Sequence, residues 1–201
     1  MKATRIQSFS DGVFAILITL LVLEFKLPEY QQGGLAQAVL AQWPTMLAYV
    51  VTYAYVGILW LFHHDLFDRV TRVTPRLNVL NLSSLFLTTL LSYSMSLLAK
   101  SLSAPDVPDV RFAVCAYDAL ALSISLSYLL IYRYLSQTSC LSEPRGSSST
   151  SYADRMRRYP PVSIGLYAAS FGTTFANVYV GLVFLVAGIT FHGYAYWRSS
   201  D

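Results

Sequence analysis

Long apolar segments alternate with short polar ones along the whole chain of 201 residues. A hydrocarbon core about 30 Å thick is crossed by about 20 helical residues. This pattern predicts membrane-spanning helices over residues 9–27, 39–67, 77–99 and 112–135. A further stretch, residues 161–197, contains no Asp, Glu, Lys or Arg.

The last apolar stretch is too long for one crossing. At a rise of about 1.5 Å per residue, a single helix over residues 161–197 would be nearly twice as long as the hydrocarbon core is thick. Two helices that turn near Asn177, over 161–177 and 178–197, fit better. The chain is therefore predicted to have six spans, with a five-span arrangement as the alternative.

The composition is that of an integral membrane protein. Charged residues make up 12% of the chain, against about a quarter in soluble proteins. Hydrophobic residues reach 55%, and the mean hydropathy is +0.48. A soluble domain of this length could not bury so much apolar surface, so we expect an all-α membrane protein.

The distribution of Lys and Arg predicts the orientation. With six spans, three of the fourteen basic residues lie on one side of the membrane, namely Lys26, Lys100 and Arg111. The other eleven lie on the side of the N-terminus, which the positive-inside rule makes cytoplasmic. Both termini are then cytoplasmic, and the Ser-rich segment 136–159 is predicted to be a flexible cytoplasmic loop. A five-span arrangement would move only Arg198, so charge does not decide between the two.

Polar residues from three spans are predicted to meet near the cytoplasmic face. Asp11 lies at the start of the first span, beside Ser10. The second span ends with ILWLFHHD, which contributes Trp60, His63 and His64. The third begins with RLNVLNLSS, which contributes Asn78 and Asn81, three residues apart and therefore on one helix face.

Two interpretations of this layer are open. In one, Asp11 only caps a helix at the membrane interface and the histidines reach toward water. In the other, the side chains form a hydrogen-bond network that fixes the first span against its neighbours, because ionisable groups inside membranes need partners. The number of polar groups at one depth favours the network.

Motifs for other chemistry are missing from the sequence. The consecutive residues His63, His64 and Asp65 point in different directions around a helix, which argues against a metal site. Cys115 and Cys140 have no metal-ligand or disulfide spacing. The chain has no HExxH, no GxSxG and no TVGYG filter, so we expect no metal, no cofactor and no enzyme.

One face of the first span is a continuous apolar stripe. Ile16, Leu20 and Leu23 follow each other at helical spacing, and Thr19 lies beside them. Such a stripe is most often lipid-facing or part of a core. Apolar constrictions can also control water and ions in a channel.

The start of the chain resembles a known family. Arg5-x-x-x-Phe9-Ser10-Asp11, followed by Ile16, is similar to the signature of the transmembrane-protein-175 potassium channels, which comprise the endolysosomal channel and its bacterial relatives. The continuation GVFAILITLLVLE, the residues Trp60 and His63 or His64, the asparagines of the third span and the six-span plan extend the resemblance.

The resemblance implies a potassium-permeable channel without a conventional filter, in a bacterial inner membrane. A single six-helix unit implies a homotetramer whose first spans surround the axis, with K⁺ as the permeant ion and no nucleic-acid partner. Ile16 then corresponds to the hydrophobic constriction, Leu20 and Leu23 lie further outward, and Thr19 contacts ions. The network that holds the pore helix is implied to comprise Arg5, Phe9, Ser10, Asp11, Trp60, His63 or His64, Asn78 and Asn81.

Other readings stay open beside the resemblance. The third span, SSLFLTTLLSYSMSLLAK, is more polar than the family leads us to expect, which leaves its packing undetermined. The main alternative function is a proton-coupled or small-solute transporter with His63, His64 and Asp118 as relay groups. An intramembrane enzyme or a non-conducting assembly partner is a further alternative.

Overall fold

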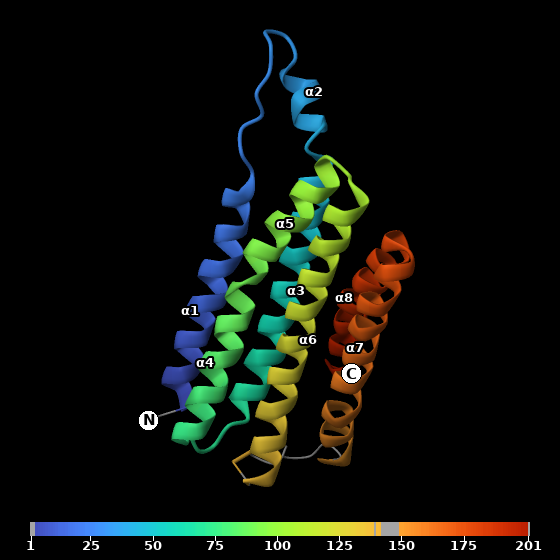
Figure 1. The fold of residues 1–201 in the computed structure, drawn as a ribbon. Helices are drawn as coiled ribbons and strands as arrows, with labels where there is room; N and C mark the ends of the chain where they lie inside the picture. Colours follow the sequence, from blue (N-terminus) through green and yellow to red (C-terminus); the bar gives the residue numbers. More distant parts are fainter. Residues whose placement is uncertain (1–2, 139, 142–148, 201) are drawn as a thin grey trace.

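The protein is a bundle of long helices that run up and down along one direction (Figure 1). The structure, a computed structural model, describes residues 3–138, 140–141 and 149–200. In chain order its helices are α1 (Ala3–Leu21), the 3₁₀ helix η1 (Val22–Glu24), α2 (Leu35–Leu40), α3 (Trp43–Asp68), α4 (Pro75–Thr89), α5 (Leu91–Ser103), α6 (Val107–Gln137), α7 (Ser149–Ala176) and α8 (Val178–Ser200). The predicted all-α class is confirmed.

Five helical segments of the described chain are long and apolar enough to cross a membrane. They are Ala3–Glu24, Trp43–Asp68, Pro75–Ser103, Val107–Gln137 and Val178–Arg198. α7 is not among them, because Pro, Gly, Ser and Thr lower the hydropathy of its apolar half. The protein is thus a multi-pass membrane protein, and the sixth span stays a prediction.

The helix ends differ from the predicted spans. α1 begins at Ala3, before residue 9, and helical structure stops at Glu24, so residues 25–27 are not helical. α3 begins at Trp43 and carries Pro44 in its first turn, where the missing N–H has no helical partner to lose. The loop predicted over 136–159 is shorter than expected, because α6 continues to Gln137 and α7 starts at Ser149. Residues 139 and 142–148 of that loop lie outside the described residues.

The third span consists of two helices, α4 and α5, that meet at Leu90. The Leu90 N–H donates to the Leu87 carbonyl at 3.2 Å, a contact three residues back instead of four. The hydroxyls of Thr89 and Ser92 donate to carbonyls of Phe86 and Thr89. Hydroxyls that bond back to the backbone bend helices, which explains both the break and how this polar span satisfies its side chains.

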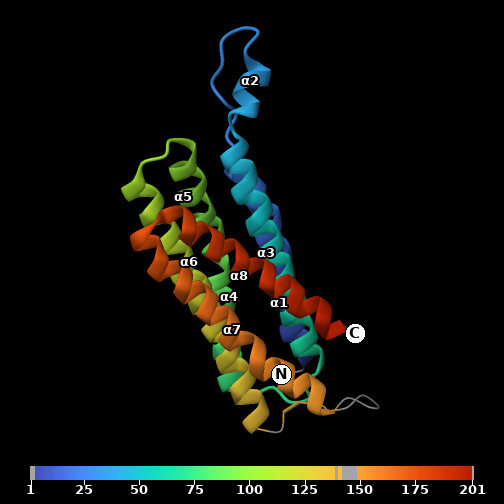
Figure 2. The ribbon, with the colours of Figure 1, turned by 90° about the vertical axis from the view of Figure 1, so that its right-hand side faces the viewer.

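The packing order places α1 and the α7–α8 pair on different sides of the bundle. α1 contacts α3, α4 and α5, whereas α7 and α8 pack against each other, against α6 and, through α8, against α3. Figure 2 shows α7 and α8 side by side, inclined across the bundle. A core of buried side chains that includes Phe14, Tyr55, Tyr117 and Tyr167 runs between these parts.

α7 and α8 form a tight hairpin that turns at Asn177. The Asn177 side-chain oxygen accepts the N–H groups of Tyr179 at 2.9 Å and Val180 at 3.4 Å, which caps the start of α8. Glycines on α8 let the two helices approach closely. A Cβ at Gly181 would overlap the Thr174 hydroxyl, and one at Gly188 would lie 2.6 Å from the Tyr167 ring.

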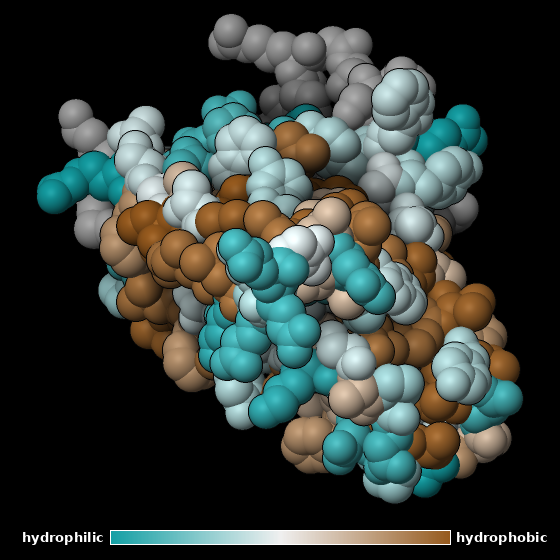
Figure 3. All heavy atoms as spheres, turned by 90° about the horizontal axis from the view of Figure 1, so that it is seen from above, coloured by the Kyte–Doolittle hydropathy of each residue, from teal (hydrophilic) through white to brown (hydrophobic). Residues whose placement is uncertain are grey.

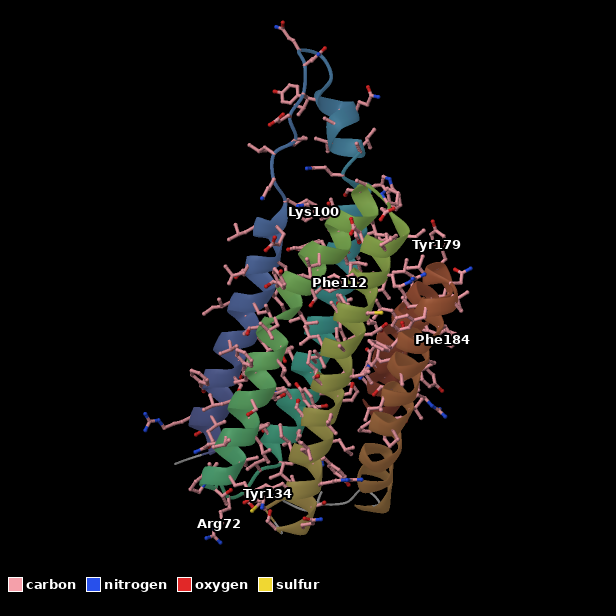
Figure 4. The ribbon with its side chains drawn as sticks, viewed as in Figure 1. Arg72, Lys100, Phe112, Tyr134, Tyr179 and Phe184 are labelled. Atoms are coloured by element: carbon pink, nitrogen blue, oxygen red, sulfur yellow. The ribbon has the colours of Figure 1, made fainter. Side chains whose placement is uncertain are left out.

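The two ends of the bundle are polar. Figure 4 labels Arg72 and Lys100 at opposite ends. Figure 3 looks down on the end that carries α2 and shows hydrophilic residues gathered over it, with hydrophobic residues on the flanks. α1 begins and α8 ends in the half of the bundle that contains Arg72.

Candidate pore helix and its anchoring network

α1 has two contrasting faces. Its buried residues follow helical spacing: Ile6, Ser10, Phe14, Leu17 and Leu21. This face packs on α3, α4 and α5. The burial of Phe14, Leu17 and Leu21 against the core holds α1 in place, so the opposite face is directed away from the subunit.

The predicted constriction residues lie on that opposite face. Ile16 is 61% exposed, Leu20 46% and Leu23 69% in the single chain. Thr19 lies on the same face and is also exposed. Three large apolar side chains therefore remain open on a helix whose other face is fully packed.

Thr19 presents an oxygen on this face. Its hydroxyl donates to the Ile16 carbonyl at 2.8 Å, a bond within the helix. Because the hydrogen is used there, the oxygen lone pairs remain free to accept or to contact a cation. The face thus carries the apolar side chain of Ile16 with a hydroxyl oxygen about one turn away.

A buried hydrogen-bond chain joins α1 to α4 and α3. His63 Nε2 donates to Asn81 Oδ1 at 2.8 Å, and Asn81 Nδ2 donates to Ser10 Oγ at 3.0 Å. All three residues are buried. The His63 ring also stacks on Phe67, with ring centroids 4.2 Å apart. Each of the three helices supplies one residue, so these hydrogen bonds fix α1 against α3 and α4.

A second, half-exposed branch surrounds Asp11. Trp60 Nε1 donates to Asp11 Oδ1 at 2.8 Å. His64 Nδ1 lies 3.9 Å from the same oxygen, and Gln7 Nε2 lies 3.3 Å from His64 Nδ1. The rings of Trp60 and His64 also contact, with centroids 5.6 Å apart. The two histidines therefore take separate branches, His63 the buried one and His64 the one at Asp11.

This geometry explains how a carboxylate is accommodated on α1. Asp11 does not cap the helix, because α1 begins at Ala3 and Asp11 lies more than two turns inside it. Its side chain is 36% exposed and accepts an indole N–H, so it keeps part of its hydration and gains a donor. The interpretation as a simple helix cap is thereby ruled out.

Three residues of the predicted network take no part in these bonds. Arg5 is exposed and forms no hydrogen bond or ion pair within the described residues, so it does not reach Asp11. Phe9 is exposed, and with Asn78 it lines a hollow of about 260 Å³ between α1 and α4. Asn78 Oδ1 is buried without a partner among the described residues. In the single chain, Arg5 and Phe9 face away from the network.

Gln7 and Tyr128 also make contacts near this network, although neither is among the predicted residues. Gln7 lies one helical turn before Asp11, a spacing that could have indicated its place beside His64. The Tyr128 hydroxyl of α6 donates to the Leu59 carbonyl of α3 at 3.1 Å, and nothing in the sequence pattern points to that contact.

Nothing in the described part of the chain resembles a metal centre. No group of three or more His, Cys, Asp or Glu side chains there is arranged to hold a metal ion. Cys115 and Cys140 are free thiols.

Comparison with known proteins identifies the family. The family model of the endosomal/lysosomal potassium channel TMEM175 matches residues 5–91. A potassium channel of Streptomyces collinus is 37% identical over 157 residues, which cover 78% of this chain and 75% of that protein. A potassium channel of Chamaesiphon minutus is 32% identical over 189 residues, which cover 91% of this chain and 90% of that protein. The chain belongs to the TMEM175 family.

A solved structure of a TMEM175 family member shares the fold. The crystal structure of a lysosomal potassium-selective channel TMEM175 homologue from Chamaesiphon minutus aligns with a TM-score of 0.78 at 29% identity, over 96% of this chain and 97% of that one. The resemblance found in the sequence is therefore confirmed. The segment matched by the TMEM175 family model runs from Arg5 in α1 to Leu91 at the start of α5, so it contains every residue of the anchoring network.

Proposed function

We propose that the protein is a potassium-permeable channel in which the α1 helices of several copies surround the ion pathway. The observation that carries this proposal is the exposed face of α1, where Ile16, Leu20 and Leu23 remain open while the other face is packed. The TMEM175 relatives, named as potassium channels, supply the permeant ion.

The assembly we propose is a homotetramer in the bacterial inner membrane. A single α1 helix encloses nothing, so copies of the chain must supply the other walls of the pathway. In the described part of the chain, α1 packs mainly on α3, with smaller contacts to α4 and α5, and this peripheral position suits a helix that lines a central axis.

The proposed topology has six spans, with α7 as the sixth, and cytoplasmic termini. The hairpin turn at Asn177 returns α8 to the half of the bundle that contains the start of α1. The excess of Lys and Arg on that side supports a cytoplasmic assignment.

Ile16 is proposed to form the narrowest, driest part of the pathway. A ring of isoleucines excludes water when the α1 helices are close, and ions cannot cross a dewetted neck. Rotation or spreading of α1 would admit water. Selection of K⁺ over Na⁺ would follow from the weaker hydration of K⁺, with the Thr19 oxygen one turn away as a contact.

The transporter alternative is less well supported by the geometry. It needs His63, His64 and Asp118 to pass a proton along one route. His63 bonds to Asn81 and His64 lies beside Asp11 and Gln7, whereas Asp118 contacts Ser170 between other helices. The hydrogen bonds described here do not connect the three groups.

The test is electrical recording from purified protein in liposomes, with K⁺ inside and Na⁺ outside. A channel gives unitary currents that reverse toward the K⁺ equilibrium potential. Currents that reverse near zero would contradict K⁺ preference. Flux that saturates with a solute and carries no unitary events would favour the transporter. Ile16→Ser protein serves as the companion sample, because an opened constriction restores current if the wild-type pathway is closed.

A further inference from the structure

Asp118 is a buried carboxyl that the proposed ion pathway does not use. It lies within α6, in the region between α6, α7 and α8, and its side chain is fully buried. Its Oδ2 lies 2.7 Å from Ser170 Oγ of α7. The same Ser170 Oγ lies 2.8 Å from the Gly181 carbonyl oxygen of α8. One hydroxyl therefore connects three helices.

The hydrogen count at Ser170 fixes the protonation of Asp118. A serine hydroxyl has one hydrogen to donate, and a backbone carbonyl can only accept. Both contacts have hydrogen-bond lengths. If Asp118 were ionised, two acceptors would compete for one hydrogen. If Asp118 is a carboxylic acid, its O–H donates to Ser170 Oγ, and the Ser170 O–H donates to the Gly181 carbonyl.

Neighbouring donors do not remove this constraint. The Thr174 hydroxyl, which packs against Gly181, donates to the Ser170 carbonyl at 2.8 Å. The Thr173 hydroxyl donates to the Ala169 carbonyl at 2.7 Å. Both are used within α7, so neither supplies the missing hydrogen.

The surroundings also favour the neutral acid. Among the described residues, the ionisable groups near Asp118 include Cys115 and Tyr117 of α6 and Tyr167 of α7, and none of these three is cationic. Arg111 lies two turns earlier on α6 and acts on Cys115, and no ion pair to Asp118 forms among the described residues. Asp118 Oδ1 is buried without a partner in the described part of the chain, which is far costlier for a carboxylate than for the carbonyl of an acid.

We propose that Asp118 is a proton-binding site that attaches the α7–α8 hairpin to α6. The bound proton completes the chain from Asp118 through Ser170 to the Gly181 carbonyl. A bound K⁺ or Na⁺ is the competing occupant, but the direct 2.7 Å contact between Asp118 and Ser170 is a hydrogen bond and leaves no gap for an ion. The proposal is independent of ion conduction.

The proposal has a definite consequence for pH. An exposed carboxyl in the unfolded chain is ionised at neutral pH, whereas the folded chain retains a proton on Asp118. The folded state then binds one proton more, so stability falls as pH rises. Release of that proton turns the Ser170 hydroxyl to the carboxylate, and the Gly181 carbonyl, which also accepts a helical N–H within α8, loses Ser170 as a second donor.

The direct test is infrared spectroscopy of the full-length protein in lipid at neutral pH. We expect a carbonyl stretching band of a protonated carboxylic acid in the wild type and its loss in Asp118→Asn. Asp109→Asn, which changes an exposed carboxyl at the start of the same helix, should leave the band unchanged. Absence of the band in the wild type would overturn the proposal.

Thermal unfolding gives a second readout. In Asp118→Asn the introduced side-chain amide donates to Ser170 as the acid does, so this variant should keep the wild-type midpoint and lose its decline with rising pH. If K⁺ or Na⁺ raises the thermal midpoint of the wild type but not that of Asp118→Asn, the site binds a metal cation instead of a proton. That result would overturn the proposal. If Asp118→Asn does not fold, Ser170→Ala serves instead: it keeps Asp118, and the acid band should shift because its acceptor is gone. An unshifted band would again contradict the assignment.

Discussion

Two polar clusters hold the peripheral helices of this channel in place. Each contains one carboxyl group, and the surroundings of these two carboxyl groups differ. On one side, Ser10, Asp11, Trp60, His63, His64 and Asn81 form the α1 network. On the other, Asp118, Ser170 and Gly181 form the Asp118 cluster. Asp11 is half-exposed and has an indole donor with an imidazole nearby, whereas Asp118 is fully buried with one hydroxyl.

The difference shows which conditions let a carboxyl remain inside a helical bundle. Where water and an indole donor reach it, as at Asp11, the side chain keeps part of its hydration and can orient a helix. Where one shared hydroxyl is the only donor among the described residues, as at Asp118, the group must hold a proton to satisfy its neighbours. The variants below test this comparison in order of their expected effect on thermal stability.

Asn81→Ala should have the largest effect. Asn81 bonds both His63 and Ser10, so its removal leaves two buried polar groups without partners. Each orphaned group costs about 1–3 kcal/mol. We expect a large fall in the thermal midpoint of the purified protein and loss of assembled channel. The control is Asn78→Ala, whose Oδ1 already has no partner among the described residues and should matter much less; equal losses in both variants would contradict the network.

Gly188→Ala should rank next and concerns the hairpin that the Asp118 cluster anchors. The added Cβ would lie 2.6 Å from Tyr167, whose buried ring stacks on His192 and cannot move freely. Overpacking of this kind costs about 1–3 kcal/mol. Gly172→Ala, where no atom lies within 4 Å, is the matched control and should keep or raise the midpoint. A midpoint for Gly188→Ala equal to that of the control would show that the α7–α8 contact is looser than described.

Most residues of the α1 network could be predicted from the sequence, but their hydrogen-bond partners could not. The members could be predicted because they occupy the ends of three spans that meet on one side of the bundle, and helical spacing groups Trp60 with its histidines. The partner of each histidine could not be predicted, because the choice of partner depends on how α3 is rotated against α1 and α4. Arg5, which its place at the start of the first span and the resemblance both put in the network, has an exposed side chain in the single chain.

The Asp118 cluster shows where pattern reasoning stops. Asp118 stands out in the sequence as the one acid of the predicted span 112–135, where the pattern suggests only a relay group. Ser170 lies 52 positions away in the chain, within a stretch that contains many hydroxyl residues. Only the crossing of α6 with the hairpin singles it out. The helices themselves follow from hydropathy, apart from ends such as Ser149, where α7 begins well before the apolar stretch.

Asp11→Ala tests the half-exposed branch and should have a smaller effect. The substitution leaves the Trp60 N–H without its acceptor, a loss of about 1–2 kcal/mol given the exposure of Asp11. We expect less assembled, conducting channel with little change in ion preference, measured by size-exclusion chromatography and liposome currents. Asp11→Asn keeps an acceptor for Trp60 and should retain most of both. Normal assembly and current in Asp11→Ala would show that this branch does not orient α1.

Ile16→Ser should have the smallest effect on stability and the clearest effect on current. If Ile16 faces a water-filled axis, serine is tolerated there, because most of the Ile16 side chain is exposed in the single chain. If Ile16 instead faces lipid, the substitution should lower the thermal midpoint, because the protein loses apolar contact with the lipid and exposes a hydroxyl to hydrocarbon. Ala15→Ser, at an adjacent exposed position, is the control. If Ile16→Ser keeps the thermal midpoint but increases the current and weakens K⁺ selectivity, the constriction lies at this residue. If the midpoint falls and the current is unchanged, Ile16 faces lipid and the constriction lies elsewhere.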